Sequence, residues 1–234
     1  MRSRRFLFIG ILLSLICQGC SQLEPLVTGS RIKSGEIDKL PYNILTVKTD
    51  SAQPQQKFPL LLVLHGTGMD GEAYLEQWEE EAGRHHVMVV SPSRQKNYVN
   101  EEKSLGIFYR LIDELSAKYP VDRRRIYIAG VSSGALIARW LVVQRPHLWK
   151  AAIFMASEPF EDWMHHTDVS KLPPVLYLHG GQDPVFPAEK IREKAELLRR
   201  LGARADLLID PEAGHEHRPE WNKIIFQWIQ NQEK

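Results

Sequence analysis

The chain has 234 residues, of which 43% are hydrophobic and 25% charged, and its formal net charge is +1. These values are typical of a globular protein, and they exclude a broad electrostatic attraction to nucleic acid. The length suffices for one sizeable core and is short for two ordinary domains, so we expect one domain after an N-terminal segment.

The N-terminal segment has the pattern of an export signal. Three arginines within the first five residues precede an apolar stretch from Phe6 to Cys17. That stretch suits the core of a signal peptide and is shorter than the ~20 residues that a membrane-spanning helix needs. Residues 1–19 are therefore predicted to be a signal peptide rather than part of the domain.

The end of this segment, Leu15-Ile16-Cys17-Gln18-Gly19-Cys20, resembles a bacterial lipoprotein processing site. The resemblance implies that Cys20 is acylated and becomes the new N-terminus, anchoring the protein in the cell envelope. Ser21, which follows Cys20, is similar to residues that permit sorting to the outer membrane. We therefore expect the protein to be anchored in the outer membrane and to face the periplasm. A cleaved secretory signal and an uncleaved anchor remain alternatives.

The cysteine content restricts the chemistry of the rest of the chain. Cys17 and Cys20 account for both cysteines, so a domain processed at Cys20 would have no thiol available for a disulfide, a zinc site or cysteine catalysis. We expect the fold to be stabilised by its core alone.

Beyond a polar segment the chain alternates two hydrophobic patterns. Residues 20–40 resemble a tether leading into an edge strand or turn, and the domain is expected at 41–234. Apolar runs predict strands at 43–49, 59–65, 87–91, 125–130, 151–156, 175–179 and 205–209. Helical patterns lie between them at 72–85, 103–119, 133–144, 187–201 and 219–230. This alternation predicts an α/β fold with a doubly wound, mostly parallel sheet.

A candidate nucleophile follows the predicted strand 125–130, in the motif Gly130-Val131-Ser132-Ser133-Gly134. A strand, a sharp turn and a helix form the context of a nucleophile elbow, in which the central serine is held in strained backbone geometry. The glycines leave room where side chains would collide with the neighbouring strand and helix. Ser132 is the predicted nucleophile, and an ordinary strand-to-helix turn is the alternative.

A serine hydroxyl needs a histidine to take its proton, and the histidine needs an acid to orient it. Asp183 follows the predicted strand 175–179, and His215 follows the strand 205–209, so both lie past carboxyl ends of strands in the expected chain order. We predict a triad of Ser132, Asp183 and His215. His217 is the alternative base, and Asp210, Glu212 and Glu158 are the alternative acids.

Hydrolysis of an ester also requires donors for the developing oxyanion. The backbone N–H of Ser133 is the predicted first donor, and the N–H of Thr67, in the loop His65-Gly66-Thr67-Gly68, is the predicted second. A glycine-rich loop without catalytic duty is the alternative for Thr67, and His65 is expected to support the loop.

Four segments together resemble α/β hydrolases of the carboxylesterase, predicted peptidase and polyhydroxybutyrate-depolymerase-like esterase type. They are Phe58–Gly66, Val121–Gly130, the Asp183 segment and Gly214-His215. The resemblance implies the α/β-hydrolase fold, the triad and hydrolysis of a small-molecule ester through an acyl-enzyme. It leaves the acyl and alcohol groups open. Relatives that open dienelactones with a cysteine nucleophile are excluded, because Ser132 occupies the elbow.

Two other functions compete with ester hydrolysis. A serine peptidase of the prolyl-oligopeptidase kind usually carries a propeller domain, for which these residues leave no room. A silent envelope-binding protein on the same scaffold would commonly lack one triad member. We expect no metal, since His165-His166 and His215-Glu216-His217 lack a converging third ligand, and we expect no cofactor.

A short connection predicts an open site. About eighteen residues, from Ser157 to Pro174, separate two predicted strands where this fold often carries its lid. That is too few for a cap domain, so we expect a minimal cap or none, with Trp163 as a candidate wall of the substrate pocket or as an aromatic packed on the sheet edge.

Overall fold

A computed structural model describes residues 31–47, 55–93, 105–159 and 168–233. The predicted signal peptide 1–19, Cys20, Ser21 and Trp163 lie outside these ranges, as do His165 and His166. Within the described ranges, no helix is both long and apolar enough to cross a membrane.

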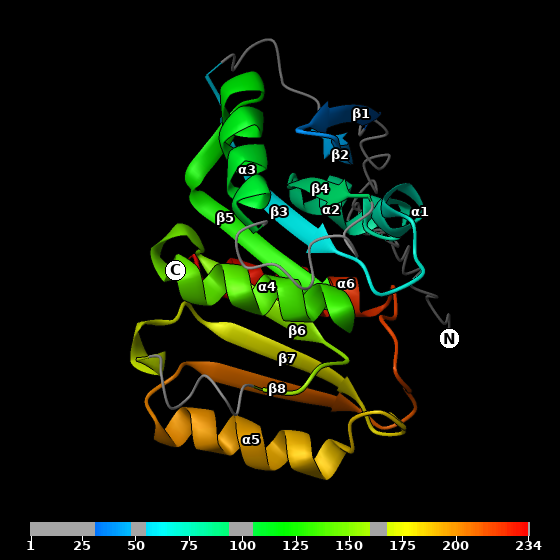
Figure 1. The fold of residues 1–234 in the computed structure, drawn as a ribbon, viewed down its shortest axis with the longest axis vertical. Coiled ribbons are helices and arrows are strands. Elements are labelled where there is room, and N and C mark those ends of the chain that lie inside the picture. Colours follow the sequence, from blue (N-terminus) through cyan, green and yellow to red (C-terminus); the bar gives the residue numbers. More distant parts are fainter. Residues whose placement is uncertain (1–30, 48–54, 94–104, 160–167, 234) are drawn as a thin grey trace, which may run out of the picture.

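The described residues form an eight-stranded sheet in the order β1-β2-β4-β3-β5-β6-β7-β8 (Figure 1). Strands β1 and β2 pair antiparallel, β2 is antiparallel to β4, and the strands from β4 to β8 are parallel. The predicted doubly wound, mostly parallel sheet is confirmed. The strands are β1 (Arg31–Ile37), β2 (Leu40–Thr46), β3 (Phe58–Leu64), β4 (Met88–Pro92), β5 (Val121–Val131), β6 (Ala151–Met155), β7 (Val175–Gly180) and β8 (Ala205–Asp210).

Helices cover both faces of the sheet (Figure 1). Helices α3, α4 and α5 contribute to the apolar core on one face, and α1, α2 and α6 to the core on the other. The helices are α1 (Gly71–Glu76), α2 (Glu79–His85), α3 (Gly106–Lys118), α4 (Ser133–Gln144), α5 (Ala188–Arg200) and α6 (Trp221–Asn231).

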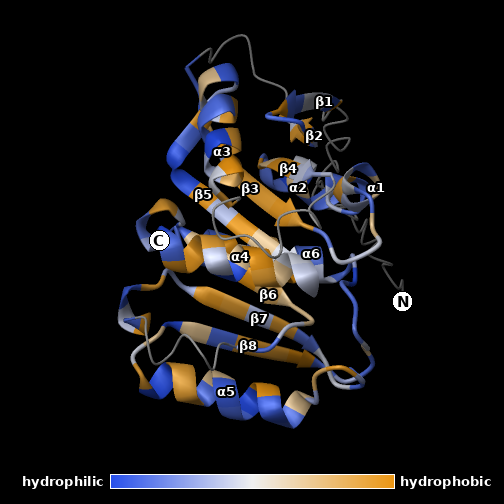
Figure 2. Cartoon of the chain, in the orientation of Figure 1, coloured by the Kyte–Doolittle hydropathy of each residue, from blue (hydrophilic) through white to orange (hydrophobic). Residues whose placement is uncertain are grey.

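The central strand β3 is apolar along its length because both of its faces are covered, as Figure 2 shows. In β3, Leu60, Leu62 and Leu64 belong to the core beneath α3 and α4. The alternate residues Leu61 and Val63 belong to the opposite core. A continuous apolar run is therefore the pattern of a central strand, and residues 59–65 could be identified by it.

The predicted tether is wrong at its C-terminal end, since residues 31–37 form β1 of the sheet. The turn to β2 consists of Asp38 and Lys39, whose φ angles are 47° and 67°. Two left-handed residues form a tight hairpin turn, which is usually signalled by Asn-Gly or Asp-Gly. Because Lys39 replaces the glycine of that signal, the pattern did not reveal the hairpin.

The predicted helix 72–85 is divided into α1 and α2. The break lies at Gln77 and Trp78, where the backbone carbonyl of Gln77 accepts a hydrogen bond of 2.7 Å from the side-chain amide of Asn222. A distant residue thus satisfies a carbonyl at the end of α1, and Trp78 becomes fully buried.

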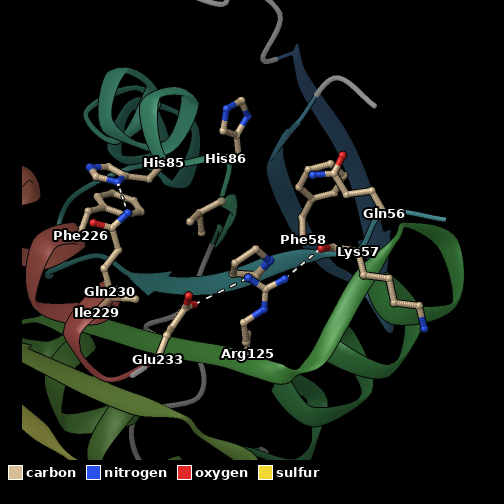
Figure 3. Close-up of a pocket in the computed structure, with 12 residues that line it drawn as sticks. Gln56, Lys57, Phe58, His85, His86, Arg125, Phe226, Ile229, Gln230 and Glu233 are labelled. Carbon is tan, nitrogen blue, oxygen red and sulfur yellow. Dashed lines mark hydrogen bonds and ion pairs between the residues drawn. The ribbon is translucent and has the colours of Figure 1, made fainter. Parts of the chain in front are cut away.

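A pocket of about 120 Å³ lies at the amino ends of β3 and β5 (Figure 3). Its polar groups pair with one another: Arg125 donates to the carbonyl of Lys57 at 3.0 Å and lies 3.8 Å from Glu233. Gln230 lies 2.9 Å from His85, whose ring stacks on Phe226. In parallel sheets the catalytic and ligand-binding side chains gather at the opposite, carboxyl ends of the strands, so the active site is expected there and not at this pocket.

Candidate active site

The loops that follow β5, β7 and β8 bring the predicted triad together at the carboxyl edge of the sheet. Ser132 directly follows β5, Asp183 lies in the loop after β7, and His215 lies in the loop after β8. The two loops are joined by a backbone hydrogen bond of 2.9 Å from Gln182 to Ala213. Neighbouring parallel strands thus fix the separation of the acid and the base.

Ser132 has the strained backbone that the motif predicted, with φ 51° and ψ −119°. Its N–H donates to the carbonyl of Met155 at 3.0 Å. A Cβ at Gly130 would lie 2.5 Å from the carbonyl oxygen of Gly134, and one at Gly134 would lie 2.1 Å from that of Leu64. Both glycines are therefore required by close backbone approach, and the turn exposes the serine between β5 and α4.

The three side chains form a continuous chain of hydrogen bonds. Nε2 of His215 lies 2.8 Å from Oγ of Ser132. Nδ1 of His215 lies 2.8 Å from Oδ2 of Asp183. An ionised carboxylate can only accept, so Nδ1 carries a proton, and Nε2 is left free to accept the hydrogen of the serine hydroxyl.

Asp183 is buried, and its second oxygen is held by the backbone. Oδ1 accepts the N–H groups of Val185 at 2.8 Å and Phe186 at 2.9 Å. Burial raises the pKa of this carboxyl, but the N–H groups of Phe186 and Val185 together with His215 outweigh burial and hold the pKa below its usual value. Asp183 therefore stays ionised across the neutral range and fixes the orientation of His215.

We predict that Asp183 stabilises the fold in a pH-dependent way. Its pKa is lower in the folded protein than the value of ~3.9 expected when unfolded, so its contribution is present above about pH 4. That contribution is lost as the pH falls through the lower folded value. Denaturant unfolding of wild type and Asp183→Asn should differ most near pH 7, and the difference should shrink below about pH 4. A difference that grows on acidification would contradict this.

Thr67 and Ser133, whose backbone N–H groups are the predicted oxyanion donors, are in contact through their side chains. Ser133 is the first residue of α4, where backbone N–H groups lack intrahelical partners. The side-chain hydroxyl of Thr67 donates to Oγ of Ser133 at 2.9 Å, which holds the loop after β3 against the elbow. The loop and the helix start therefore lie next to the nucleophile, as the sequence indicated.

The alternative base, His217, occupies a different environment. Its Nε2 lies 2.8 Å from Oδ1 of Asn222, so it has an amide as its partner instead of a carboxylate. Burial lowers the pKa of His217 to about 4. A histidine with that pKa is a weak proton acceptor at neutral pH, whereas His215 makes both hydrogen bonds that a general base needs.

The alternative acids have other partners. Asp210 accepts from the indole of Trp221 at 3.0 Å and pairs with Arg218 at 3.3 Å. Glu158 pairs with Lys194 at 2.7 Å. Glu212 contacts Arg218 through its backbone: its main-chain carbonyl accepts from Arg218 at 2.8 Å. Among the four carboxylates considered, Asp183 is the one that contacts His215.

One histidine beside the acid was missed from the sequence. His179, at the end of β7, is buried; its Nε2 donates to the carbonyl of Phe186 at 2.8 Å and lies 3.6 Å from Oδ2 of Asp183. It therefore braces the loop that carries the acid. The spacing of four residues between His179 and Asp183 was the available signal.

In the described parts of the chain, no cluster of three or more His, Cys, Asp or Glu is arranged to hold a metal ion.

Residues 107–173, from α3 to the connection after β6, match the Prolyl oligopeptidase family. The chain is 36% identical over 66 residues to Acyl-protein thioesterase 1 of Gibberella zeae, a stretch covering 28% of each protein. It is 25% identical over 203 residues to the uncharacterized peptidase YuxL of Bacillus subtilis, covering 68% of this chain and 31% of that protein. The matches thus span less than a third of the length of these two relatives.

The fold has counterparts among solved structures. The crystal structure of the S-formylglutathione hydrolase FrmB from Staphylococcus aureus superposes with a TM-score of 0.68 and 16% sequence identity. The superposition covers 88% of this chain and 98% of that one. At this identity the likeness establishes the arrangement of strands and helices.

Proposed function

We propose that this chain is a serine hydrolase of the α/β-hydrolase superfamily and that it cleaves carboxylic esters through an acyl-enzyme. The observation that carries the proposal is the unbroken chain of hydrogen bonds from Asp183 through His215 to Ser132. Similarity to a protein named as a thioesterase supports an acyl substrate.

In the proposed reaction, Nε2 of His215 takes the proton of Ser132 while Oγ attacks the carbonyl carbon of the ester. The tetrahedral intermediate collapses, His215 gives the proton to the leaving alcohol, and the acyl group remains on Oγ. His215 then takes a proton from a water molecule while the water oxygen attacks the acyl carbon. The second tetrahedral intermediate collapses, the bond to Oγ of Ser132 breaks, and Oγ takes the proton back from His215 as the acid is released. Asp183 stabilises the imidazolium formed in each half.

The N–H groups of Thr67 and Ser133 are the proposed donors to the oxyanion. The 2.9 Å hydrogen bond between their side chains keeps the backbone of Thr67 close to that of Ser133. Donors that are already in place cost no reorganisation when the negative charge develops, and this contribution is commonly the largest single one.

The proposal is tested with a panel of soluble aryl esters of rising acyl length, with feruloyl, thioester and peptide substrates beside them. We expect turnover of oxygen esters, with Ser132→Ala as the blank. A preference for the thioester, with little activity on oxygen esters, would show that thioesters and not oxygen esters are the substrate class. Inactivity on every substrate, with the triad intact, would favour the non-catalytic binding protein.

The same panel tests the proposed open site. A site that has no cap to move should show a rate that saturates with soluble short-chain esters and does not jump when the substrate forms an emulsion. A sharp rise at the emulsion threshold would contradict an open site. Trp163→Ala, if this residue walls the pocket, should alter acyl or alcohol preference more than stability.

A serine peptidase is the second candidate, because residues 107–173 match the Prolyl oligopeptidase family. The triad serves amide as well as ester hydrolysis, and the peptide arm of the panel distinguishes the two. Cleavage of peptides at a kcat/KM comparable with that of short esters would favour the peptidase.

We also propose that a lipid on Cys20 holds the protein in the envelope, facing the periplasm from the outer membrane. The proposal rests on the N-terminal sequence that resembles a lipoprotein signal. Cys20→Ala should move the protein from the membrane fraction to the soluble or unprocessed fraction, because acyl chains supply the anchoring. Wild type in the soluble fraction, with no added lipid mass, would contradict it.

A further inference from the structure

Four aromatic side chains gather between the loop of Thr67 and the loop of His215: His65, Tyr74 and Trp78 are buried, and His217 is half-buried. Tyr74 lies in ring contact with the other three, at centroid distances of 6.3 Å to His65, 6.1 Å to Trp78 and 5.5 Å to His217. Trp78 and His217 also stack at 5.0 Å. The cluster therefore joins α1 to both loops, with Tyr74 at its centre.

The hydrogen bonds of His217 fix which of its nitrogens carries the proton. The side-chain amide nitrogen of Asn222 donates to the carbonyl of Gln77 at 2.7 Å, so Oδ1 of Asn222 is its acceptor. Nε2 of His217, 2.8 Å from that oxygen, must donate. Burial holds the ring neutral, which leaves Nδ1 as a bare acceptor.

His65 is fixed in the complementary way. Its Nδ1 lies 2.8 Å from the carbonyl of Gly66, which can only accept, so Nδ1 carries the proton. Its Nε2 is then a bare acceptor. His65 directly precedes the Gly66-Thr67 turn of the proposed oxyanion loop, and His217 lies two residues after the proposed base His215.

The unused polar atoms of the cluster are complementary. Within the described ranges, Nε2 of His65, the hydroxyl of Tyr74, Nε1 of Trp78 and Nδ1 of His217 are buried and have no hydrogen-bond partner. Two are acceptors, and the hydroxyl and the indole N–H are donors. Burial raises the pKa of Tyr74, so the hydroxyl keeps its proton to donate. The indole N–H of Trp78, directed at the hydroxyl oxygen, lowers that pKa but is the smaller effect.

Leaving four such groups unsatisfied in one place is unfavourable, and pairing them with one another removes the cost. We propose that the Tyr74 hydroxyl is a positioning group for the proposed hydrolysis: it donates its hydrogen to one bridging water, and that water donates its two hydrogens to the bare nitrogens of His65 and His217. The link holds the loop of Thr67 at a fixed distance from the loop of His215. This inference rests on the proposed function of both loops.

The link would act on the transition state more than on substrate binding. Donors at Thr67 and the base at His215 must meet the same reacting carbonyl, and small errors in their placement reduce the rate strongly. None of the four aromatic side chains is proposed to touch the substrate. Loss of the link should therefore lower kcat and leave KM nearly unchanged.

Tyr74→Phe tests this role, because it removes the hydroxyl and keeps the ring. We expect kcat per active site to fall roughly tenfold, with KM within about twofold. Labelling of Ser132 by a fluorophosphonate should slow by a similar factor. Tyr177→Phe is the matched control: Tyr177 is also buried, its hydroxyl also lacks a hydrogen-bond partner among the described residues, and it lies in the other core.

A second variant separates positioning from packing. His217→Gln can keep the donation to Asn222 and removes Nδ1, the buried ring nitrogen without a hydrogen-bond partner among the described residues. If Tyr74 acts through His217, the double variant should be little slower than the slower single variant. Losses that multiply fully would overturn the link, as would a Tyr74→Phe enzyme with the kcat and labelling rate of wild type and of Tyr177→Phe.

Phosphonate labelling keeps this test separate from the test of ester hydrolysis. If wild type cleaves none of the esters but labels rapidly, the proposed substrate class fails while the slower labelling of Tyr74→Phe still supports the link. If wild type cleaves esters and Tyr74→Phe matches it in both readouts, the link fails and the proposed function stands.

Discussion

Replacing Ser132 with alanine should lower ester hydrolysis by on the order of 10⁴-fold or more, because the members of a serine triad act as a unit. The hydroxyl of Ser132 is the nucleophile whose proton His215 accepts. Alanine has no hydroxyl, so the acyl-enzyme cannot form. The remaining activity would come from the oxyanion donors and substrate binding. Initial rates on a soluble aryl ester measure the loss.

A fluorophosphonate probe checks the same assignment without a substrate. Ser132 should be labelled in wild type, and labelling should fail in His215→Ala. Labelling that persists in His215→Ala and disappears in His217→Ala would assign the base to His217. Activity retained in Ser132→Ala and abolished in Ser133→Ala would show that the register of the elbow is wrong.

The triad could be predicted because its chemistry imposes local signals. The elbow needs glycines on both sides of Ser132, and the acid and base must follow strands whose apolar runs are visible in the sequence. Each predicted strand overlaps one of the strands from β2 to β8, although the ends differ. Chain order and strand ends were therefore sufficient to select Asp183 and His215.

Features set by distant contacts could not be predicted in this way. The break between α1 and α2 depends on Asn222, which reaches the carbonyl of Gln77 across 145 positions of the sequence. The helical pattern of residues 72–85 continues through that point. A local sequence pattern cannot predict a helix break that is caused by a side chain of α6.

The start of β5 was also placed too late, for a local reason. Arg123, Arg124 and Arg125 form a charged run of the kind found in loops, yet the strand begins at Val121. Asp122 accepts hydrogen bonds from the side chains of Arg124 and Arg125, and the pairing with β3 shifts register between Phe58 and Leu60. An irregularity in the sheet thus accommodates residues that a regular strand pattern excludes.

The second large effect is expected at Gly134, where alanine should destabilise the fold by about 3 kcal/mol and abolish most activity. The added Cβ would lie 2.1 Å from the carbonyl oxygen of Leu64 and 2.5 Å from that of His65. These oxygens belong to the end of β3 and the start of the proposed oxyanion loop. Since Leu64 pairs with Gly130 of β5, α4 can move away only by distorting the turn that carries the nucleophile.

Gly83→Ala is the matched control for Gly134→Ala, because both glycines lie in helices. A Cβ at Gly83 in α2 would meet no atom within 4 Å, so alanine there should raise the free energy of unfolding by roughly 0.5–1 kcal/mol through helix propensity. Denaturant unfolding of both variants measures the contrast. Equal stability of the two would mean that the close approach of α4 to β3 is not the constraint on residue 134, and the requirement for glycine would have to come from the substrate side of the elbow.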